Sequence, residues 1–217
     1  MPSTESDSRR PGTLWVRNLD WPLPDNIVPR VPATFRCIGP DEIDSLAQVM
    51  RLGNPAILQQ RFASGRRCYV AQVEGALAAY GWVSLNEEEI GEIRLRIHLM
   101  PGEAYIWDCG TAPVYRRLRL YTALLLHITD QLRAEGLCRA WIGADGDNVA
   151  SQQGMALAGF RPVADLVVAR VLAMRMFWVR GRAGVPEAVV TDARRALLGN
   201  RDQAWLGALS RVKADRA

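Results

Sequence analysis

The stretch TAPVYRRLRLYTALLLHI, residues 111–128, begins as a proline-bearing turn and continues as a run that is apolar at every third or fourth position. This spacing predicts a helix from about Val114 to Glu135 that ends at Gly136. The residues before the turn, EAYIWDCG at 103–110, predict a strand. A strand that leads into a helix N-terminus exposes free backbone N–H groups at the positive end of the helix dipole, so this turn is a candidate phosphate-binding site.

Three arginines stand in this turn: Arg116, Arg117 and Arg119. Their guanidinium groups can each form two parallel hydrogen bonds to phosphate oxygens, which would reinforce the backbone N–H groups. The alternative is that the arginines form only the solvated face of a first helical turn. Position alone does not separate these two interpretations.

The segments on either side of the turn predict the fold class. Before it, the sequence patterns predict a strand, two helices and three antiparallel strands, at 33–38, 39–50, 55–63, 67–75, 76–85 and 91–100. Glu74 and Gly75 predict a tight hairpin between the first two of those three strands. After the long helix we expect a strand at 138–144, a helix at 148–158 and a strand region from Phe160 to about Trp178. A meander followed by crossover helices implies an α/β protein with a mixed sheet.

Composition favours one medium-sized domain with terminal extensions, since the chain has 217 residues, 49% hydrophobic and 23% charged. A net charge of +4 suits an anionic ligand and does not require nucleic acid as a partner. Residues 1–31 hold five prolines and a polar start, and predict a flexible N-terminal arm that docks near Trp15 and Trp21. We expect the main domain at 32–180 and a basic helical extension at 181–217, docked on the domain or on another subunit as in a homodimer.

The cysteines and histidines predict neither a metal site nor a disulfide framework, because the four cysteines are scattered singly and only two histidines are present. The N-terminus lacks the apolar core of a signal peptide, and no stretch approaches the roughly 20 apolar residues that cross a bilayer. We therefore expect a cytoplasmic protein with reduced thiols and no membrane span. The four cysteines and two histidines of the chain are Cys37, Cys68, His98, Cys109, His127 and Cys138.

A second pattern lies downstream in NVASQQGMALAGF, residues 148–160. It predicts a helix capped by Asn148 that ends at Gly159, followed by a strand from Phe160. Together with the P-V-Y-R turn and the strand order, this pattern resembles the GNAT superfamily of acyl-CoA-dependent N-acyltransferases. The resemblance runs from about Ala33 to about Trp178 and implies a mixed, mostly antiparallel sheet flanked by helices. It also implies acetyl-CoA or another acyl-CoA as co-substrate.

In that family the turn reads approximately V-x-P-x-Y-R-G-x-G-x-G/A and a leucine-rich helix follows. The resemblance implies that pantetheine binds strand amides, that diphosphate binds the helix start, and that the cap of the next helix adds a contact. The residues so assigned are Cys109, Gly110, Thr111, Arg116, Arg117, Leu118, Arg119, Leu120, Tyr121 and Asn148.

The chain departs from the family where Arg117, Arg119 and Tyr121 replace small residues. Glycine lets the backbone approach a diphosphate closely, and a long side chain occupies that space. Residues in the first turn of a helix have φ near −63°, so we expect that glycine is not required there for backbone geometry. The sequence thus predicts weakened or altered binding of a CoA-type group.

Acyl transfer also needs a base for the amine and a proton for the departing thiolate. Glu103 lies thirteen residues before Arg116. Some members of the family carry their general base at this position. The other interpretation of Glu103 is an exposed carboxylate at the start of a strand. Asp108 is the second candidate for the general base, and the other interpretation of Asp108 is a structural ion pair with an arginine. Strand alternation places Cys109 with Glu103, Tyr105 and Trp107 on one face, opposite Asp108.

The family's usual proton donor is a tyrosine seven residues after the capping asparagine, and Met155 stands there. Tyr121 and Cys109 are the alternative donors near the turn. Trp82 and Trp107 are predicted in the core, with the acceptor pocket as their alternative location.

The sequence therefore predicts an N-acyltransferase that moves an acyl group from acyl-CoA to a primary amine of a small molecule or peptide. Two alternatives stay open. The missing glycines and tyrosine favour a non-catalytic GNAT-fold module that binds or regulates. The basic turn also suits a donor attached to an acyl-carrier protein.

Overall fold

A central sheet organises the molecule in the computed structural model, which describes residues 12–25, 27–90, 95–171 and 174–199. Its strands are β1 (Gly12–Asn18), β2 (Thr34–Ile38), β3 (Arg67–Val73), β4 (Ala76–Ser84), β7 (Glu103–Thr111), β8 (Arg139–Ala144), β9 (Arg161–Val171) and β10 (Met174–Gly181). The helices are α1 (Ile43–Met50), α2 (Ala56–Ala63), α3 (Leu120–Ala134), α4 (Val149–Leu157) and α5 (Glu187–Leu198). Short 3₁₀ turns, η1 (Pro40–Glu42) and η2 (Pro113–Tyr115), precede α1 and α3.

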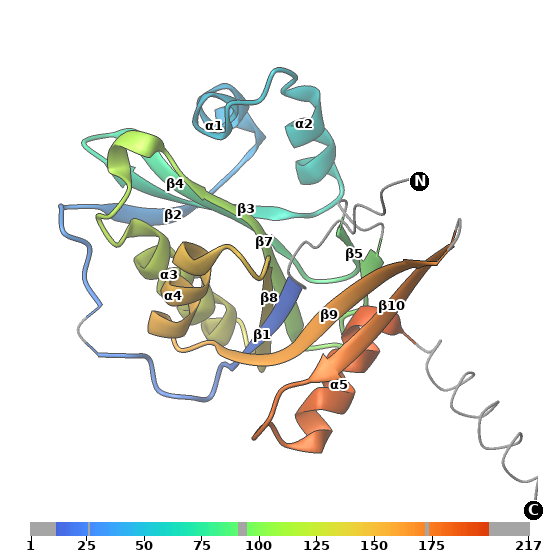
Figure 1. The fold of residues 1–217 in the computed structure, drawn as a ribbon. Helices are drawn as coiled ribbons and strands as arrows, with labels where there is room; N and C mark the ends of the chain where they lie inside the picture. The colour runs from blue at the N-terminus through green and yellow to red at the C-terminus, as the bar shows by residue number, and fades with distance from the viewer. Residues whose placement is uncertain (1–11, 26, 91–94, 172–173, 200–217) are drawn as a thin grey trace, which may run out of the picture.

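The strand order is β10-β9-β1-β8-β7-β4-β3-β2 (Figure 1). Only the β7–β8 pair is parallel, and every other pair in this sheet is antiparallel. The β3–β4 hairpin turns at Glu74 and Gly75, whose φ angles of 51° and 83° suit a two-residue turn with positive φ. The predicted α/β fold with a mixed, mostly antiparallel sheet flanked by helices is confirmed.

Strand β1 lies in the middle of the sheet, between β8 and β9. Its residues Leu14, Trp15 and Val16 are at most 6% exposed. The prediction of a flexible arm at 1–31 is therefore wrong for residues 12–18, while residues 1–11 lie outside the described part of the chain. A strand covered on both faces reads as a continuous apolar run without alternation, and the flanking prolines obscured it.

Arg17 anchors β1 to the rest of the molecule. Its side chain is buried, and it donates hydrogen bonds of 2.9 Å to the carbonyls of Ala158, at the end of α4, and Pro22. Burial lowers the pKa of its guanidinium. Gly159 leaves the room that Arg17 needs, because a Cβ on Gly159 would lie 1.8 Å from Nη1 of Arg17.

Two groups of helices cover opposite faces of the sheet. Leu124 and Ile128 of α3 join Ile106 of β7 in one core, together with residues of α4. On the other face, α5 packs against Tyr105, the neighbour of Ile106, and α1 and α2 cover β3 and β4. Figure 1 shows the resulting layers, with α1 and α2 at one end of the sheet and α5 at the other. Helix α5 thus belongs to the core, whereas residues 200–217 lie outside the described part.

Three element boundaries differ from the expectations. Helix α3 begins at Leu120 instead of about Val114, because η2 and an extended residue, Arg116, come first. The expected strand at 91–100 contributes β6 (Leu95–Ile97), which pairs with β5 (Glu88–Ile90) in a separate two-stranded sheet. The strand region after Phe160 is a hairpin of β9 and β10.

Candidate active site

The parallel strands β7 and β8 separate halfway along their length. They pair from Glu103 opposite Arg139 to Ile106 opposite Ile142, and not beyond. From Trp107 to Thr111, β7 still runs beside β4 and leaves its other edge facing the gap. A cleft of about 570 Å³ lies there, lined on its β7 side by Tyr105, Trp107, Asp108 and Cys109. The unpaired edge of β7 presents backbone groups to any ligand in this cleft.

A β-bulge in β7 bends the strand at this point. Tyr80 faces Gly110 and Trp82 faces Trp107, so Gly81 of β4 opposes two residues of β7. One of the two, Asp108, has a φ of 41°. The bulge also shifts the alternation of side chains.

Because of the bulge, Cys109 packs against the core under α3, with Ile106, while Trp107 packs on the opposite face. The prediction that Cys109 shares a face with Tyr105 and Trp107 is therefore wrong. Burial raises the pKa of the Cys109 thiol, which keeps it protonated. Gly110 follows, and a Cβ there would lie 2.6 Å from the ring of Tyr80.

The turn before α3 keeps a backbone that favours glycine, although it carries arginines. Arg117 and Arg119 have φ angles of 65° and 61°. The prediction of φ near −63° is wrong at both positions, because these residues precede the helix, with Arg119 as its N-cap. Successive N–H groups in such conformations form a concave site for anions. The N–H of Ala123 donates to the carbonyl of Arg119 and is the first N–H of α3 to bond back to this turn. The N–H groups of α3 before Ala123 therefore have no helical partner.

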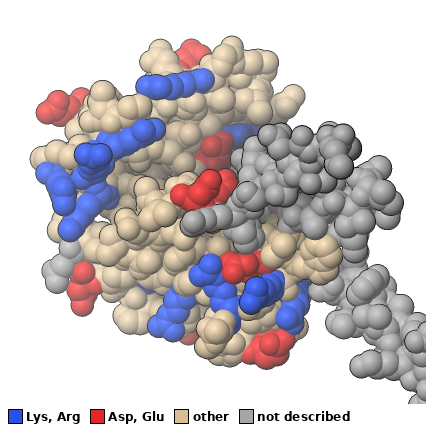
Figure 2. Space-filling model, viewed as in Figure 1, with Lys and Arg blue, Asp and Glu red and all other residues tan. Residues whose placement is uncertain are grey.

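Positive charge gathers around the turn. Arg116, Arg117 and Arg119 are exposed, and within the described residues none of them forms an ion pair. The N–H of Arg30, which is also exposed, donates to the carbonyl of Leu118 and brings a fourth arginine to the turn. Figure 2 shows basic side chains on the side of the molecule where this turn lies in Figure 1, and acidic side chains nearer the centre of the same face. The arginines of the turn themselves do not line the cleft.

Tyr121, Asn148 and Ser151 line the cleft on the side of α3 and α4. The Asn148 side chain accepts a hydrogen bond from the N–H of Ser151, so its predicted role as helix cap is confirmed. The hydroxyls of Tyr121 and Ser151 lie 3.0 Å apart. Leu120 is 1% exposed in the core, so only its backbone can face a ligand.

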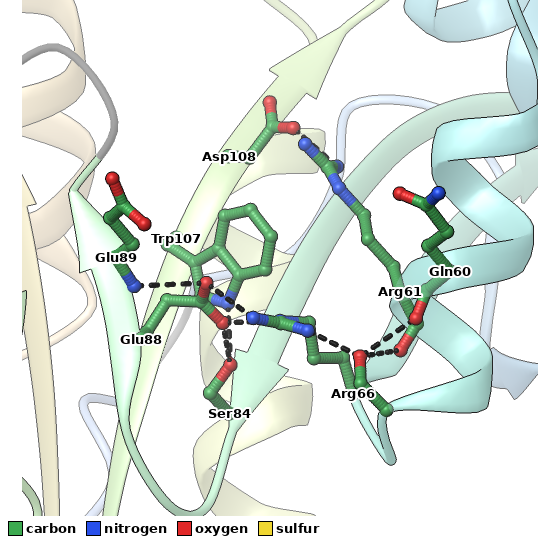
Figure 3. Close-up of polar contacts among 9 residues, drawn as sticks. Gln60, Arg61, Arg66, Ser84, Glu88, Glu89, Trp107 and Asp108 are labelled. Atoms are coloured by element: carbon green, nitrogen blue, oxygen red, sulfur yellow. Dashed lines mark hydrogen bonds and ion pairs between the residues drawn. The ribbon is translucent and has the colours of Figure 1, made fainter.

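Asp108 and Arg61 form an ion pair on the opposite side of the cleft (Figure 3). Nη1 of Arg61, on α2, lies 2.6 Å from Oδ2 of Asp108. The guanidinium carbon lies 4.5 Å from the ring centroid of Trp107 and 5.1 Å from that of Trp82, within the range of cation–π attraction. Glu89 of β5 also lines the cleft, and its carboxylate has no partner among the described residues.

A buried hydrogen-bond network holds Trp107 from behind. Its indole N–H donates to Ser84 Oγ at 2.9 Å, and Ser84 is hydrogen-bonded to Glu88. Glu88 is 4% exposed and also accepts two hydrogen bonds from Arg66, at 2.5 and 2.9 Å (Figure 3). All of these groups have partners, so the network fixes the ring of Trp107 beside Asp108.

Glu103 lies at the far end of β7 from the turn. Cys109 lies six positions further along the chain, which corresponds to about 20 Å along a strand. Its carboxylate is 5% exposed and accepts hydrogen bonds from Arg139 at 3.3 Å, Arg195 at 3.0 Å and the N–H of Met100 at 3.0 Å. It does not line the cleft. The structure therefore separates Glu103 from the other predicted site residues, and its expected exposure is wrong.

Sequence reasoning missed Arg61 and Glu89. Arg61 lies on a short helix without a motif, and Glu89 belongs to a run of three glutamates. No sequence signal distinguishes either residue, because chain topology alone brings α2 and β5 to the cleft. Trp107, by contrast, was a candidate for the acceptor pocket and does line the cleft.

The fold agrees with comparisons to known proteins. A model of the acetyltransferase (GNAT) family matches residues 40–160, more than half of the chain. The chain belongs to the GNAT acetyltransferase family. No curated protein gives a match.

Among solved structures, a GNAT-family acetyltransferase from Colwellia psychrerythraea is 14% identical with a TM-score of 0.53, covering 80% of this chain and 57% of its own. The chain thus spans little more than half of that relative. The ribosomal-protein-S18-alanine N-acetyltransferase from Escherichia coli is 16% identical with a TM-score of 0.48, covering 70% of this chain and 97% of its own. An aminoglycoside acetyltransferase from an uncultured soil metagenomic sample, in complex with sisomicin, is 14% identical with a TM-score of 0.45. The match covers 58% of this chain and 86% of that protein.

Within the described residues no helix is long and apolar enough to cross a membrane. The same part of the chain holds no group of three or more His, Cys, Asp or Glu side chains that could bind a metal ion.

Proposed function

We propose that the protein transfers an acyl group from acyl-CoA to the primary amine of a small molecule or peptide. The observation that carries this proposal is the separation of β7 from β8 beside a turn with free N–H groups. Pantetheine fits along the unpaired edge of β7 at Cys109, Gly110 and Thr111. The diphosphate fits the N–H groups of the turn, with Arg116, Arg117, Leu118, Arg119 and Leu120 around it. The anionic end of the donor thus meets the basic turn before α3.

The acceptor enters from the side of Arg61, Glu89 and Trp107. Arg61 offsets the charge of Asp108 in their ion pair, so the carboxylate of Glu89 is the group of this side that favours a positively charged amine over a neutral or anionic one. Trp107 offers an aromatic surface beside them. Peptide and small-molecule amines both satisfy this chemistry, so the acceptor class remains a primary amine.

Asp108 is the proposed general base. Asp108 lines the cleft; its Oδ2 binds Arg61, while Oδ1 has no hydrogen-bond partner among the described residues. Oδ1 accepts a proton from the ammonium group of the acceptor, and the neutral nitrogen attacks the thioester carbonyl. The C–S bond then breaks with its electron pair on sulfur, and the acylated nitrogen gives its second proton to solvent, which leaves a neutral amide. Glu103, by contrast, is engaged at the other end of the strand and takes no part in this proposal.

The test is a free-thiol assay with acetyl-CoA and a panel of primary amines. We expect Asp108→Asn to lower kcat by about 100-fold, the lower end of general-base effects. Glu89→Gln should raise KM for the amine and leave kcat nearly unchanged. Asp130→Asn is the matched control, because Asp130 is an exposed carboxylate of α3 that does not line the cleft. Full activity of Asp108→Asn would remove Asp108 from the mechanism.

A non-catalytic binding module is the second candidate. One observation favours it: Met155, at the position of the family's usual proton donor, is fully buried. A module would bind CoA in isothermal titration calorimetry and release no thiol with any amine. A donor bound to an acyl-carrier protein would show as turnover with carrier-bound acyl groups alone. Absence of CoA binding would overturn both the enzyme and the CoA-binding module.

A further inference from the structure

The ring of Tyr121 lies against α4 at a position where α4 has a glycine. A Cβ on Gly154 of α4 would lie 2.5 Å from Cδ1 of the Tyr121 ring, so the ring passes over α4 only because residue 154 is glycine. Gly154 is the neighbour of Met155 in the chain. The aromatic ring therefore reaches α4 from α3, one residue away from the methionine that cannot donate a proton.

The phenol is ordered and protonated. Its oxygen lies 3.0 Å from Ser151 Oγ, and either hydroxyl can donate in that hydrogen bond. Burial raises the pKa of Tyr121 well above its ordinary value of 10.0. The residue lines the cleft together with Cys109 of the unpaired β7 edge. The cleft thus holds a neutral O–H donor next to the proposed path of pantetheine.

We propose that Tyr121 is the general acid of the acyl transfer and protonates the departing CoA thiolate, a role that rests on the proposed function. When the C–S bond breaks, the electron pair stays on sulfur and the Tyr121 O–H proton moves to it. The phenolate left behind keeps its hydrogen bond from Ser151 and is reprotonated by solvent, which returns the residue to its starting state. Cys109 is the weaker alternative, because its Sγ donates to the carbonyl of Trp107 at 3.5 Å and packs toward the core.

The first experiment measures binding and does not depend on turnover. Calorimetry compares CoA with desulfo-CoA, which lacks only the sulfur atom, in the wild-type chain and in Tyr121→Phe. A phenol that contacts the sulfur should make CoA bind about 5- to 10-fold more tightly than desulfo-CoA, the effect of one hydrogen bond. Tyr121→Phe should abolish that preference and leave desulfo-CoA affinity unchanged. Equal preferences in the two proteins would overturn the proposal.

The second experiment measures kcat at saturating acetyl-CoA and amine. Tyr121→Phe retains the ring over Gly154, and we expect kcat to fall about 100-fold with KM for acetyl-CoA within twofold. Tyr69→Phe is the matched control, because Tyr69 is a buried tyrosine of β3 that does not line the cleft. A kcat of Tyr121→Phe within twofold of wild type refutes the role of Tyr121 while leaving acyl transfer intact. Loss of thiol release in the wild-type chain instead counts against the proposed function, and the CoA comparison then still decides whether Tyr121 contacts the sulfur.

Discussion

Replacing Glu103 with glutamine tests whether the carboxylate of Glu103 has a structural or a catalytic role. The carboxylate binds Arg139 and Arg195 and caps the N–H of Met100. Removing one partner of a buried ion pair costs about 3–5 kcal/mol. The two arginine side chains are 22% and 27% exposed and keep Asp192 as a partner at 2.6 and 3.7 Å. Solvent and Asp192 offset part of the loss, so we expect Glu103→Gln to destabilise the protein by about 2 kcal/mol.

In a domain of this size a loss of about 2 kcal/mol lowers Tm by roughly 4–8 °C. Thermal unfolding followed by circular dichroism measures this shift. CoA affinity and kcat per folded molecule, measured well below the transition, should stay within twofold of wild type. The reason is that Glu103 lies at the opposite end of β7 from the turn.

Glu135→Gln provides the matched comparison. Glu135 pairs with Arg67 at the surface, with side chains 40% and 35% exposed, and such a pair contributes about 0–1 kcal/mol. The reasoning fails if Glu103→Gln leaves Tm unchanged and lowers kcat by 100-fold or more. That result would return Glu103 to the chemistry, as the resemblance to the family suggested.

Three further predictions concern buried and strained groups. Arg17→Met should lower stability by about 2–4 kcal/mol in urea unfolding, because the buried carbonyl of Ala158 and the part-buried carbonyl of Pro22 lose their donor. Replacing Arg117 and Arg119 by glycine should raise Tm through relief of left-handed strain, and should weaken CoA binding and its salt dependence in calorimetry. Burial raises the pKa of Tyr80 to about 12, above its ordinary 10.0, so the folded state holds a proton that the unfolded state has lost. Its contribution to stability is complete below pH 10 and is lost as the pH rises through about 12, which alkaline unfolding with and without Tyr80→Phe measures.

Sequence patterns predicted the helices and most strands because each has a local signal. The β3–β4 hairpin has Glu74–Gly75 at its turn, α4 has Asn148 as its cap, and α3 ends before Gly136. Strand β1 lacked such a signal, because both of its faces are buried and prolines flank it. Burial on two faces removes the alternation on which strand prediction depends.

The site was harder to predict because a local irregularity of β7 and contacts between distant segments decide its geometry. The bulge at Asp108 moves Cys109 to the other face of β7, and strand alternation cannot anticipate an extra residue. Asp108 itself is compatible with the bulge, since aspartate tolerates positive φ better than most residues. The acceptor side depends on α2 and β5, which only the tertiary structure brings beside β7. The position of Glu103 at the far end of β7 was not predictable either, since spacing along the chain does not give distance from the turn.

The conformation of the turn bears on the choice between an enzyme and a module that has lost its ligand. A left-handed φ costs an arginine about 1–2 kcal/mol, and such strain persists only where the surrounding structure imposes it. Here the neighbours do so: Leu120 is locked in the core and the carbonyl of Leu118 is held by the N–H of Arg30. Arg117 and Arg119 therefore keep the backbone that glycine would adopt, with their side chains exposed around the free N–H groups. A turn in this state keeps free N–H groups and positive charge available for an anion, which supports the proposed donor site over a module that has lost its ligand.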